Sequence, residues 1–371
     1  MQEGRSKPEK DKASSRSMAP VFVLGCPRSG TTLLYDMLLS AGGFAVYLAE
    51  SNVFNLLATR FGDLASRTNR EKLWRAWAGS KLFRATGLNR SSIHKKVLEE
   101  CHDSGDFLRI VMDEIAFVQG AQRWAENSPE AILHLPVIKK LIPDALVIHI
   151  IRDGRDVAMS LSRLRYLRPF PGQKRPSVFA AGVYWEWIVQ RGREHGKALG
   201  TDYLEVRFED LIASPQKTLD LAGGFIEQAL NYQKIRRIGY GSVNRPNTSF
   251  SMEHGSGSFN PVGRWKAGLP PEQLARLEGI IGKTLLELGY APASDSGLPA
   301  MTAEMRSTRL LYRSYFQTKL WFKLSPLIRL LLPELTAEEI DATVLAEDHA
   351  PEGRTFVEPN NPMIDELRRA R

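Results

Sequence analysis

The chain has 371 residues, of which 43% are hydrophobic and 25% are charged. This composition excludes a collagen-like or largely disordered protein and is typical of a globular protein with a sizeable core. Fifty basic and 42 acidic residues give a formal net charge of +8, which suits an anionic ligand, a nucleic acid or a membrane surface without choosing among them. Two cysteines are too few for a disulfide framework or a cysteine-rich zinc site.

The first seventeen residues are polar and charged and contain no apolar run. They therefore lack the hydrophobic segment of a signal peptide and a membrane anchor. We predict a disordered basic arm over residues 1–17, a main domain over 18–295, and a helical C-terminal extension and tail over 296–371. The expected location is the cytoplasm.

A short apolar run over residues 21–24 ends at a glycine and predicts a buried parallel strand. Apolar residues at helical spacing follow over 32–39, and this helix is expected to end near Gly42 and Gly43. Residues 44–47 are predicted to return to the sheet as a short strand. A strand, a loop and a helix in this order are typical of the opening of an α/β domain.

The rest of the main domain continues this alternation. Residues 51–120 are mostly helical in pattern, and Trp74 and Trp77 in this region are interpreted as a core stripe. Further elements are predicted as strands over 145–151 and 203–208, helices over 216–230 and 270–288, and a functional loop over 239–261. These elements predict a three-layer α/β fold, in which helices flank a central parallel sheet.

The C-terminal extension contains a basic amphipathic segment over residues 314–335. Such a helix can make a peripheral membrane contact, but docking on its own domain or in a homodimer is the favoured interpretation. Lys319, Lys323, Pro326 and Arg329 argue against a spanning helix, which needs about 20 apolar residues.

The stretch after the first strand carries the chemistry. Gly25 and Gly30 are separated by four residues and are followed by Thr31 and Thr32. This spacing is close to the phosphate loop G-x-x-x-x-G-K-[ST], where backbone N–H groups and the next helix cradle an anion. Thr31 stands in place of the lysine, and Arg28 supplies a cation from within the loop. The missing lysine argues against a triphosphate, because that lysine reaches the β- and γ-phosphates.

A second anion site is predicted where the strand over 145–151 ends. Arg152 follows this strand at the carboxyl edge of the sheet, where open α/β sheets bind ligands. Ser160 lies about two helical turns further on, so its hydroxyl and the Arg152 guanidinium can converge on one phosphate. The alternative is a helix-capping turn in which Arg152 pairs with Asp153 or Asp156.

Three stretches, in this order along the chain, resemble motifs of the sulfotransferase family, in particular its bacterial and protein-tyrosine branches. The loop resembles the family's 5′-phosphosulfate loop, residues 150–160 resemble its 3′-phosphate motif, and residues 263–266 resemble a late Gly-Arg-Trp-Lys element. Members of this family have a P-loop kinase-like fold and use 3′-phosphoadenosine 5′-phosphosulfate (PAPS) without an obligatory metal. The resemblance implies a sulfotransferase domain over 18–295 and these donor-binding residues: Pro27, Arg28, Ser29, Gly30, Thr31, Thr32, Arg152, Ser160, Arg264, Trp265 and Lys266.

Three residues are the candidates for catalysis. Arg28 is expected to stabilise charge on the departing phosphate. Glu50 is the leading general base, because the protein-tyrosine branch has a glutamate at about this distance after the loop. His134 is the alternative base, since cytosolic small-molecule members use a histidine. Asn127 stands where many members have a lysine, so one expected cation is missing.

The acceptor is left open. A hydroxyl or amine on a small molecule, glycan, lipid or peptide is possible, and the pocket is expected between residues 52–122 and the loop 239–260. Two other functions remain, a P-loop small-molecule kinase and a non-catalytic nucleotide-binding protein on the same fold. Nucleic-acid binding is not expected, because basic residues are dispersed and no basic strand carries interleaved aromatics.

Overall fold

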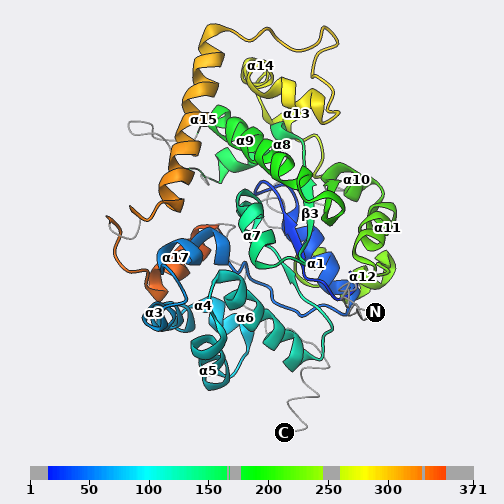
Figure 1. The fold of residues 1–371 in the computed structure, drawn as a ribbon. Helices are drawn as coiled ribbons and strands as arrows, with labels where there is room; N and C mark the ends of the chain where they lie inside the picture. Colours follow the sequence, from blue (N-terminus) through cyan, green and yellow to red (C-terminus); the bar gives the residue numbers. More distant parts are fainter. Residues whose placement is uncertain (1–15, 165–166, 168–176, 245–259, 328–330, 348–371) are drawn as a thin grey trace, which may run out of the picture.

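The computed structural model describes residues 16–164, 167, 177–244, 260–327 and 331–347. Within them, four parallel strands form one sheet in the order β2-β1-β3-β4 (Figure 1). The strands are β1 Val21–Leu24, β2 Ala125–Glu126, β3 Leu146–Ile151 and β4 Tyr203–Arg207. All four therefore end at the same edge of the sheet, where the loops that follow them meet.

Alternate side chains of the central strands enter two different cores. Phe22 and Leu24 of β1 join one hydrophobic cluster, and Val21 and Val23 join the other. The residues of β3 divide in the same way between the two clusters. The period of two residues in a strand explains this division, and burial on both faces explains why these strands are continuous apolar runs.

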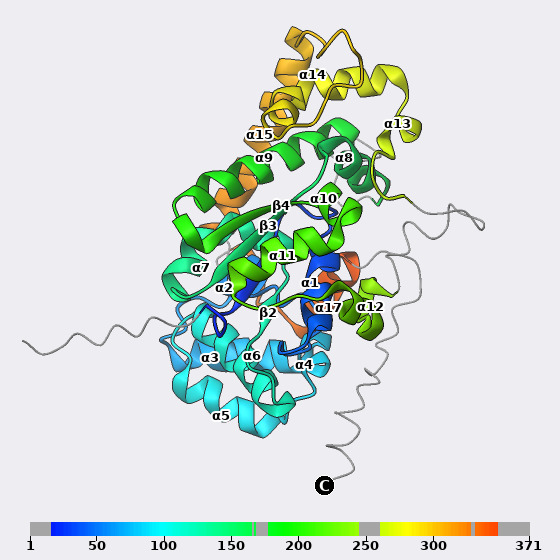
Figure 2. The same ribbon diagram turned by 90° about the vertical axis from the view of Figure 1, so that its right-hand side faces the viewer.

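Helices cover both faces of the sheet (Figure 2). One face packs against α1 Thr31–Ala41, α10 Phe208–Ala213, α11 Pro215–Ile226 and α12 Tyr232–Ile238. The other face packs against α7 Leu135–Leu141, α8 Gly154–Arg163 and α9 Val178–Lys197. The predicted three-layer α/β fold with a central parallel sheet is confirmed.

A group of helices follows the first α/β unit and lies at the bottom of Figure 1. Trp74 and Trp77 are buried there, and their rings contact Phe83 and, from Trp77, Phe107, so the interpretation of a core stripe is confirmed. The elements are the π-helix η1 Val53–Leu57, α2 Ala58–Arg60, α3 Arg67–Gly79, α4 Lys81–Thr86, α5 Arg90–Glu100 and α6 Ser104–Gln119.

The C-terminal elements are α13 Trp265–Gly268, α14 Pro271–Glu287, α15 Ala303–Leu324 and α17 Ala337–Glu347. The long helix α15 runs along α9, where Arg309 bonds to the buried Glu186 and where Tyr312 and Phe316 are buried. The last helix packs on α3 and α4, and Asp341 accepts a hydrogen bond from the backbone N–H of Lys81. The extension therefore joins α9, one of the helices that cover the sheet, to the helical group.

Four details of the sequence prediction are wrong. Residues 44–47 form no strand beyond one bridge between Phe44 and Arg123. The strand expected over 203–208 ends at Arg207, because Phe208 begins α10. The helix expected over 216–230 ends at Ile226, and residues 227–231 connect it to α12. The helix expected over 314–335 is α15, which begins much earlier and ends at Leu324, two residues before a proline that disfavours continuation.

Three smaller turns complete the described elements: the 3-10 helices η2 Pro129–His134, η3 Gly200–Asp202 and η4 Gly241–Val243. Of the arm expected over 1–17, Arg16 and Ser17 are described, and Arg16 donates hydrogen bonds to Thr201, Asp202 and Phe225. The rest of that arm, residues 245–259 of the expected loop and residues 348–371 of the tail lie outside the described residues.

Two histidines, His134 in η2 and His149 in β3, are buried in neutral form. Burial lowers the pKa of His134 to about 4, and the charges of Lys323 on α15 and His195 on α9 lower it further. His149 in β3 has its pKa lowered to about 3, chiefly by burial, and its Nδ1 lies 2.6 Å from the hydroxyl of Tyr203. Each of these histidines takes up a proton more readily in the unfolded chain, where the pKa is about 6.5.

We therefore expect the free energy of unfolding to fall as the pH falls from about 6.5 towards 4, because the unfolded chain binds protons that the folded chain does not. For His134 alone the loss between pH 7 and pH 5 is about 2 kcal/mol. Urea unfolding at the two pH values measures it, and His134→Gln should reduce the difference. An unchanged pH dependence in this variant would contradict the burial of a neutral His134.

Candidate active site

The loop between β1 and α1 has the backbone shape of an anion nest. The φ values of Arg28 and Gly30 are positive, at 72° and 96°, whereas those of Pro27, before Arg28, and Ser29, between the two, are not. Such alternation turns successive N–H groups towards one point. Gly30 is required here for a second reason, since a Cβ on it would lie 2.3 Å from the ring of Phe208.

The loop also holds a polar atom that lacks a protein partner. Ser29 is 0% exposed, and its Oγ has no hydrogen-bond partner among the described residues. A buried hydroxyl without a partner costs free energy unless a ligand or water satisfies it. Thr31 is buried beside it at the start of α1, and Thr32 is half-buried. The loop residues thus fit a bound phosphate or sulfate group.

Arg152 lies at the end of β3 and contacts this loop directly. Its Nη1 donates a 3.0 Å hydrogen bond to the carbonyl of Arg28, and its Nη2 donates a 2.6 Å bond to the carbonyl of Pro261. The guanidinium also lies over the Phe208 ring at 4.6 Å. It is 3% exposed, so this cation is held between the loop, the strand and the segment before α13.

Asp156 in the first turn of α8 anchors that segment. Its carboxylate accepts hydrogen bonds from the backbone N–H groups of Gly263 and Trp265, at 2.8 Å and 2.9 Å. It also lies 3.6 Å from Arg152. Asp153 instead caps α8 and pairs with Arg155, so the Arg152–Asp156 pairing considered as an alternative occurs together with the loop contacts.

The structure brings the two predicted anion sites together. The Nε of Arg28 donates a 3.1 Å hydrogen bond to Ser160 Oγ, so the loop cation reaches the serine of the second motif. Burial lowers the pKa of Arg152, Asp156 and Glu209 oppose this, and the nearby charge of Arg264 adds to the lowering. Because the positive charges of Arg152 and Arg264 repel each other, an anion bound between them is favoured.

The last predicted donor-binding residues divide into two kinds. The Trp265 ring is buried, with Arg155 3.8 Å from its centroid, and its Nε1 donates to Asp153. This side chain holds its segment in place. Lys266 is exposed and lies 5.7 Å from the same ring, and Arg264 is half-buried near Arg152. These two residues supply the cationic side chains of this segment.

Glu50 precedes a segment that is tied to the carboxyl end of β2. The neighbouring Ser51 donates a 2.6 Å hydrogen bond to Glu126, and the backbone N–H of Asn52 donates to Ser128 Oγ at 3.0 Å. The Ser128 hydroxyl and N–H bond to the same Glu126 carboxylate. Because β2 pairs with β1, these bonds hold the half-buried Glu50 at the edge of the sheet that carries the loop.

Glu126 is the residue that sequence reasoning missed. It is 2% exposed, and burial raises its pKa while the hydrogen bonds of Ser128 and Ser51 oppose this rise. Its strand has two residues, which is too short for a period to be recognised. Asn127, between Glu126 and Ser128, is buried, and no described residue bonds to its Oδ1. The available signal in the sequence was the run of three polar residues, Glu-Asn-Ser, within the stretch Ala-Glu-Asn-Ser-Pro.

His134 is placed elsewhere. It ends η2, and its charged neighbours are Lys323 on α15 and His195 near the end of α9. None of the contacts that define the loop, Arg152 or Ser160 involves this histidine among the described residues. The structure therefore groups Arg28 with Arg152 and Ser160, and groups His134 with the C-terminal extension.

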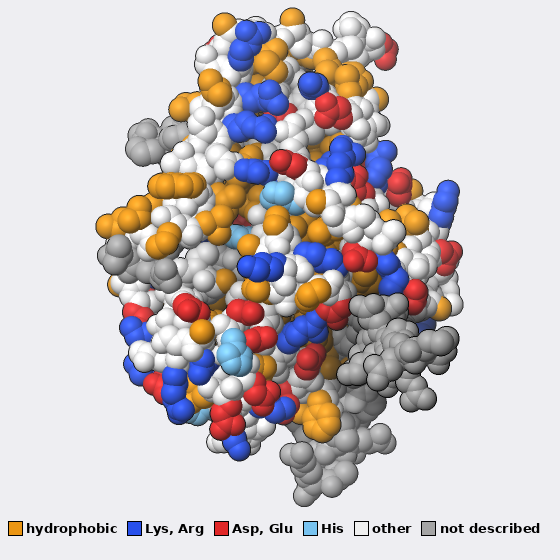
Figure 3. Space-filling view, in the orientation of Figure 1, with side chains coloured by type: hydrophobic (Ala, Val, Ile, Leu, Met, Phe, Trp, Pro, Cys, Tyr) orange, Lys and Arg blue, Asp and Glu red, His pale blue; other side chains and the backbone are white. Residues whose placement is uncertain are grey.

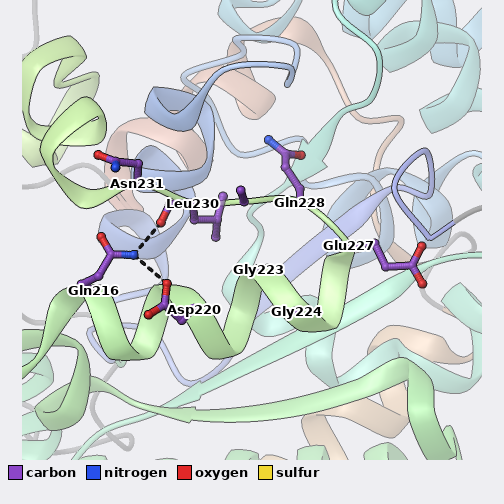
Figure 4. Close-up of a pocket in the computed structure, with 9 residues that line it drawn as sticks. Gln216, Asp220, Gly223, Gly224, Glu227, Gln228, Leu230 and Asn231 are labelled. Carbon is purple, nitrogen blue, oxygen red and sulfur yellow. Dashed lines mark hydrogen bonds between the residues drawn. The ribbon is translucent and has the colours of Figure 1, made fainter.

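A surface pocket of about 440 Å³ lies between α11 and the segment 227–231 that leads to α12 (Figure 4). Its wall includes Gln216, which bonds to Asp220 and to the carbonyl of Leu230, and Gln228, which bonds to Gly42. Gly42 caps the C-terminal end of α1, whereas the loop lies at the N-terminal end of that helix. The pocket is therefore separate from the anion site.

Comparison with known proteins agrees with this geometry. The model of a family described as the sulfotransferase family matches residues 20–227. A Caenorhabditis briggsae protein, assigned by its name to the protein-tyrosine sulfotransferases, is 24% identical over 76% of this chain and 93% of its own length. Protein-tyrosine sulfotransferase 1 of Danio rerio is 23% identical over 75% of this chain and 74% of its own length.

Among solved structures, the sulfotransferase domain from the curacin biosynthetic pathway aligns with a TM-score of 0.49 and 16% identity, over 73% of this chain and 98% of that domain. The family match covers more than half of the chain and includes both the loop and the Arg152 motif. The chain belongs to the sulfotransferase family.

Proposed function

We propose that this protein is a PAPS-dependent sulfotransferase, which transfers a sulfuryl group from PAPS to a hydroxyl or amine acceptor. The observation that carries the proposal is the junction of two anion sites at one edge of the sheet. Arg152 contacts the backbone of the loop, and Arg28 of the loop contacts Ser160 of the second site. A donor with phosphate groups on both its 5′ and its 3′ oxygen requires two such sites side by side.

Each of the two sites contains residues suited to the anionic group of PAPS that it would bind. The nest from Pro27 to Thr32, with the Ser29 hydroxyl, would hold the 5′-phosphosulfate. Arg152, Ser160, Arg264 and Lys266 would hold the 3′-phosphate, since arginine binds phosphate oxygens with paired N–H donors. Trp265 contributes by fixing the segment that carries Arg264 and Lys266.

PAPS supplies an activated sulfur bonded to a good leaving group. The acceptor oxygen or nitrogen forms a bond to this sulfur, the bond between sulfur and the 5′-phosphate oxygen breaks, and the acceptor proton passes to the base. Arg28 is the loop residue whose fixed positive charge can offset the charge that develops on the departing phosphate. With Asn127 in the place of the family's usual lysine, Arg28 has a larger share of this task.

Glu50 is the proposed general base. The bonds from Ser51 and Asn52 to Glu126 and Ser128 tie its segment to the carboxyl end of β2, which pairs with β1. Glutamate is a common base for hydroxyl acceptors. His134 is the weaker candidate, because its pKa of about 4 makes it a poor proton acceptor and its neighbours are Lys323 and His195. Glu126 is proposed to position the segment that follows Glu50.

The acceptor class is proposed from the relatives. Two of them are named protein-tyrosine sulfotransferases, so a phenolic hydroxyl on a peptide is the first acceptor to test. Small-molecule, glycan and lipid hydroxyls and amines follow. A P-loop kinase is the second candidate function, and the threonine at position 31 argues against it.

Arg152→Ala should bind adenosine 3′,5′-bisphosphate about 100-fold more weakly than the wild type, because a buried cation to the 3′-phosphate is lost. Isothermal titration calorimetry without magnesium measures this. Arg152→Lys retains the charge and should lie between the two. Arg75→Ala, on the exposed side of α3, is the matched control and should bind like the wild type.

Preference of the wild type for ATP with magnesium over the bisphosphate would contradict the donor assignment and favour the kinase. Equal losses in Arg152→Ala and Arg75→Ala would contradict the assigned 3′-phosphate site. A thermal unfolding scan of each variant separates weakened binding from a failure to fold.

Arg28→Ala should lower kcat about 100-fold or more, because the loop loses the cation that offsets charge on the leaving phosphate. The measurement is transfer of labelled sulfate to a panel of a tyrosine peptide, a phenol, a sugar and a primary amine. Arg28→Lys keeps the charge and should recover part of the rate. A wild-type rate in Arg28→Ala would show that another cation performs this task.

Glu50→Gln should retain bisphosphate binding and lose about 100-fold or more of the transfer rate, as expected for removal of a general base. The same sulfate-transfer panel measures the rate, and calorimetry measures the binding. His134→Gln provides the comparison and should transfer at close to the wild-type rate. If Glu50→Gln stays active while His134→Gln loses activity, the histidine is the base.

A further inference from the structure

The surface charge of the molecule does not indicate the chemistry of the sulfuryl acceptor. Figure 3 shows basic and acidic side chains interspersed over the face drawn there, so the charge of that face selects no class of molecule. Polar atoms buried near the candidate site are more informative. Each such atom without a partner in the protein requires one from a ligand or from water.

Two asparagines near Glu50 have atoms of this kind. Asn127 and Asn55 are each 4% exposed, and the Oδ1 of each has no hydrogen-bond partner among the described residues. Asn55 lies in the π-helix η1, three residues after Asn52. The backbone N–H of Asn52 donates to the hydroxyl of Ser128, the residue after Asn127. The two asparagines therefore lie on segments that are hydrogen-bonded to each other.

The neighbouring serines do not supply the missing hydrogen bonds. The hydroxyls of Ser51 and Ser128 and the N–H of Ser128 all donate to the Glu126 carboxylate. An amide oxygen only accepts hydrogen bonds, so a ligand that satisfies it must bring an N–H or O–H group. The phosphosulfate oxygens of PAPS carry no hydrogen at neutral pH. The partner of these amide oxygens is therefore to be found in the sulfuryl acceptor.

Asn127 lies on the side of the loop opposite to Arg152. The sheet order β2-β1-β3-β4 places β2 on one side of β1, and β3 with Arg152 on the other. Asn127 follows β2 directly, and two residues later the carbonyl of Pro129 accepts a 3.2 Å hydrogen bond from the N–H of Gly25, where the loop begins. The proposed nucleotide site is on the side of β3, which leaves the side of β2, with the Glu50 segment, for the sulfuryl acceptor.

We propose that Asn127 determines the acceptor specificity of the reaction, an inference that rests on the proposed sulfotransferase function. Its amide oxygen accepts a hydrogen bond from a second O–H or N–H group of the acceptor, next to the group that receives the sulfuryl group. The acceptor class is therefore a molecule with two neighbouring donors, such as a catechol, a vicinal diol or a sugar. A lone hydroxyl leaves the Asn127 oxygen buried and unpaired, which lowers kcat/KM about tenfold or more.

The test compares two pairs of acceptors whose members differ in one donor: catechol with 2-methoxyphenol, and trans-1,2-cyclohexanediol with trans-2-methoxycyclohexanol. Transfer of labelled sulfate from PAPS gives kcat/KM for each. In at least one pair the wild type should prefer the diol to its methyl ether about tenfold or more. Asn127→Leu replaces the amide with an apolar group of similar size. It should remove this preference, apart from the statistical factor for two equivalent hydroxyls.

Two further variants serve as controls. Asn127→Asp keeps an oxygen at this position and should keep the preference, because its added charge lowers the rates of both members of a pair and leaves their ratio. Asn69→Leu removes a half-buried asparagine of α3 whose amide donates to the carbonyl of Asp63, and its ratio should equal that of the wild type. Calorimetry with adenosine 3′,5′-bisphosphate shows that the variants are folded, and Asn127→Leu should bind it like the wild type.

An unchanged ratio in Asn127→Leu overturns the proposal, as does a wild type that transfers sulfate equally to both members of each pair. Loss of bisphosphate binding in Asn127→Leu, with a normal thermal unfolding scan, also overturns it, because Asn127 then contacts the donor. These results leave the proposed function intact. A wild type that binds no bisphosphate and transfers sulfate to no acceptor contradicts the proposed function itself.

Discussion

The contacts of one guanidinium determine how the site is built. Arg152 leaves the end of β3, donates to the backbone of the loop at Arg28 and to Pro261, and lies 3.6 Å from Asp156. A buried cation is tolerated only when hydrogen bonds and opposite charge compensate for its lost hydration. Those compensating groups come from the loop after β1, from α8 and from the segment before α13. The three motifs, which are far apart in the sequence, are therefore held at one edge of the sheet by the requirements of a single side chain.

The same physical rule explains the other buried charges. Asp156 is compensated by two backbone N–H groups and Arg152, and Glu126 by two serine hydroxyls and a backbone N–H. Each carboxylate joins two segments that are distant in sequence. Asp156 connects α8 to α13, and Glu126 connects β2 to the chain after Glu50. Burial raises the pKa of both groups, which shows that position is maintained at an electrostatic cost.

The C-terminal extension has two sides with different chemistry. Its inner side completes the hydrophobic core through Phe316 and pairs Arg309 with Glu186, and it places Lys323 beside His134. Its outer side exposes leucines and Trp321.

The sequence by itself determined β1, β3 and β4, the phosphate loop and the Arg152 motif, because each depends on local pattern: apolar runs, glycine spacing and strand-to-helix order. It also indicated the sulfotransferase family through three stretches in order. Only the tertiary structure decided which residues that are distant in sequence contact one another. It showed that Arg28 bonds to Ser160, that Trp265 faces inward, that Glu126 holds the segment after Glu50, and that His134 lies against Lys323 and His195. These contacts join residues at least 60 positions apart in the sequence. A local sequence pattern does not specify such contacts or the direction in which these side chains point, because both depend on how distant segments pack together.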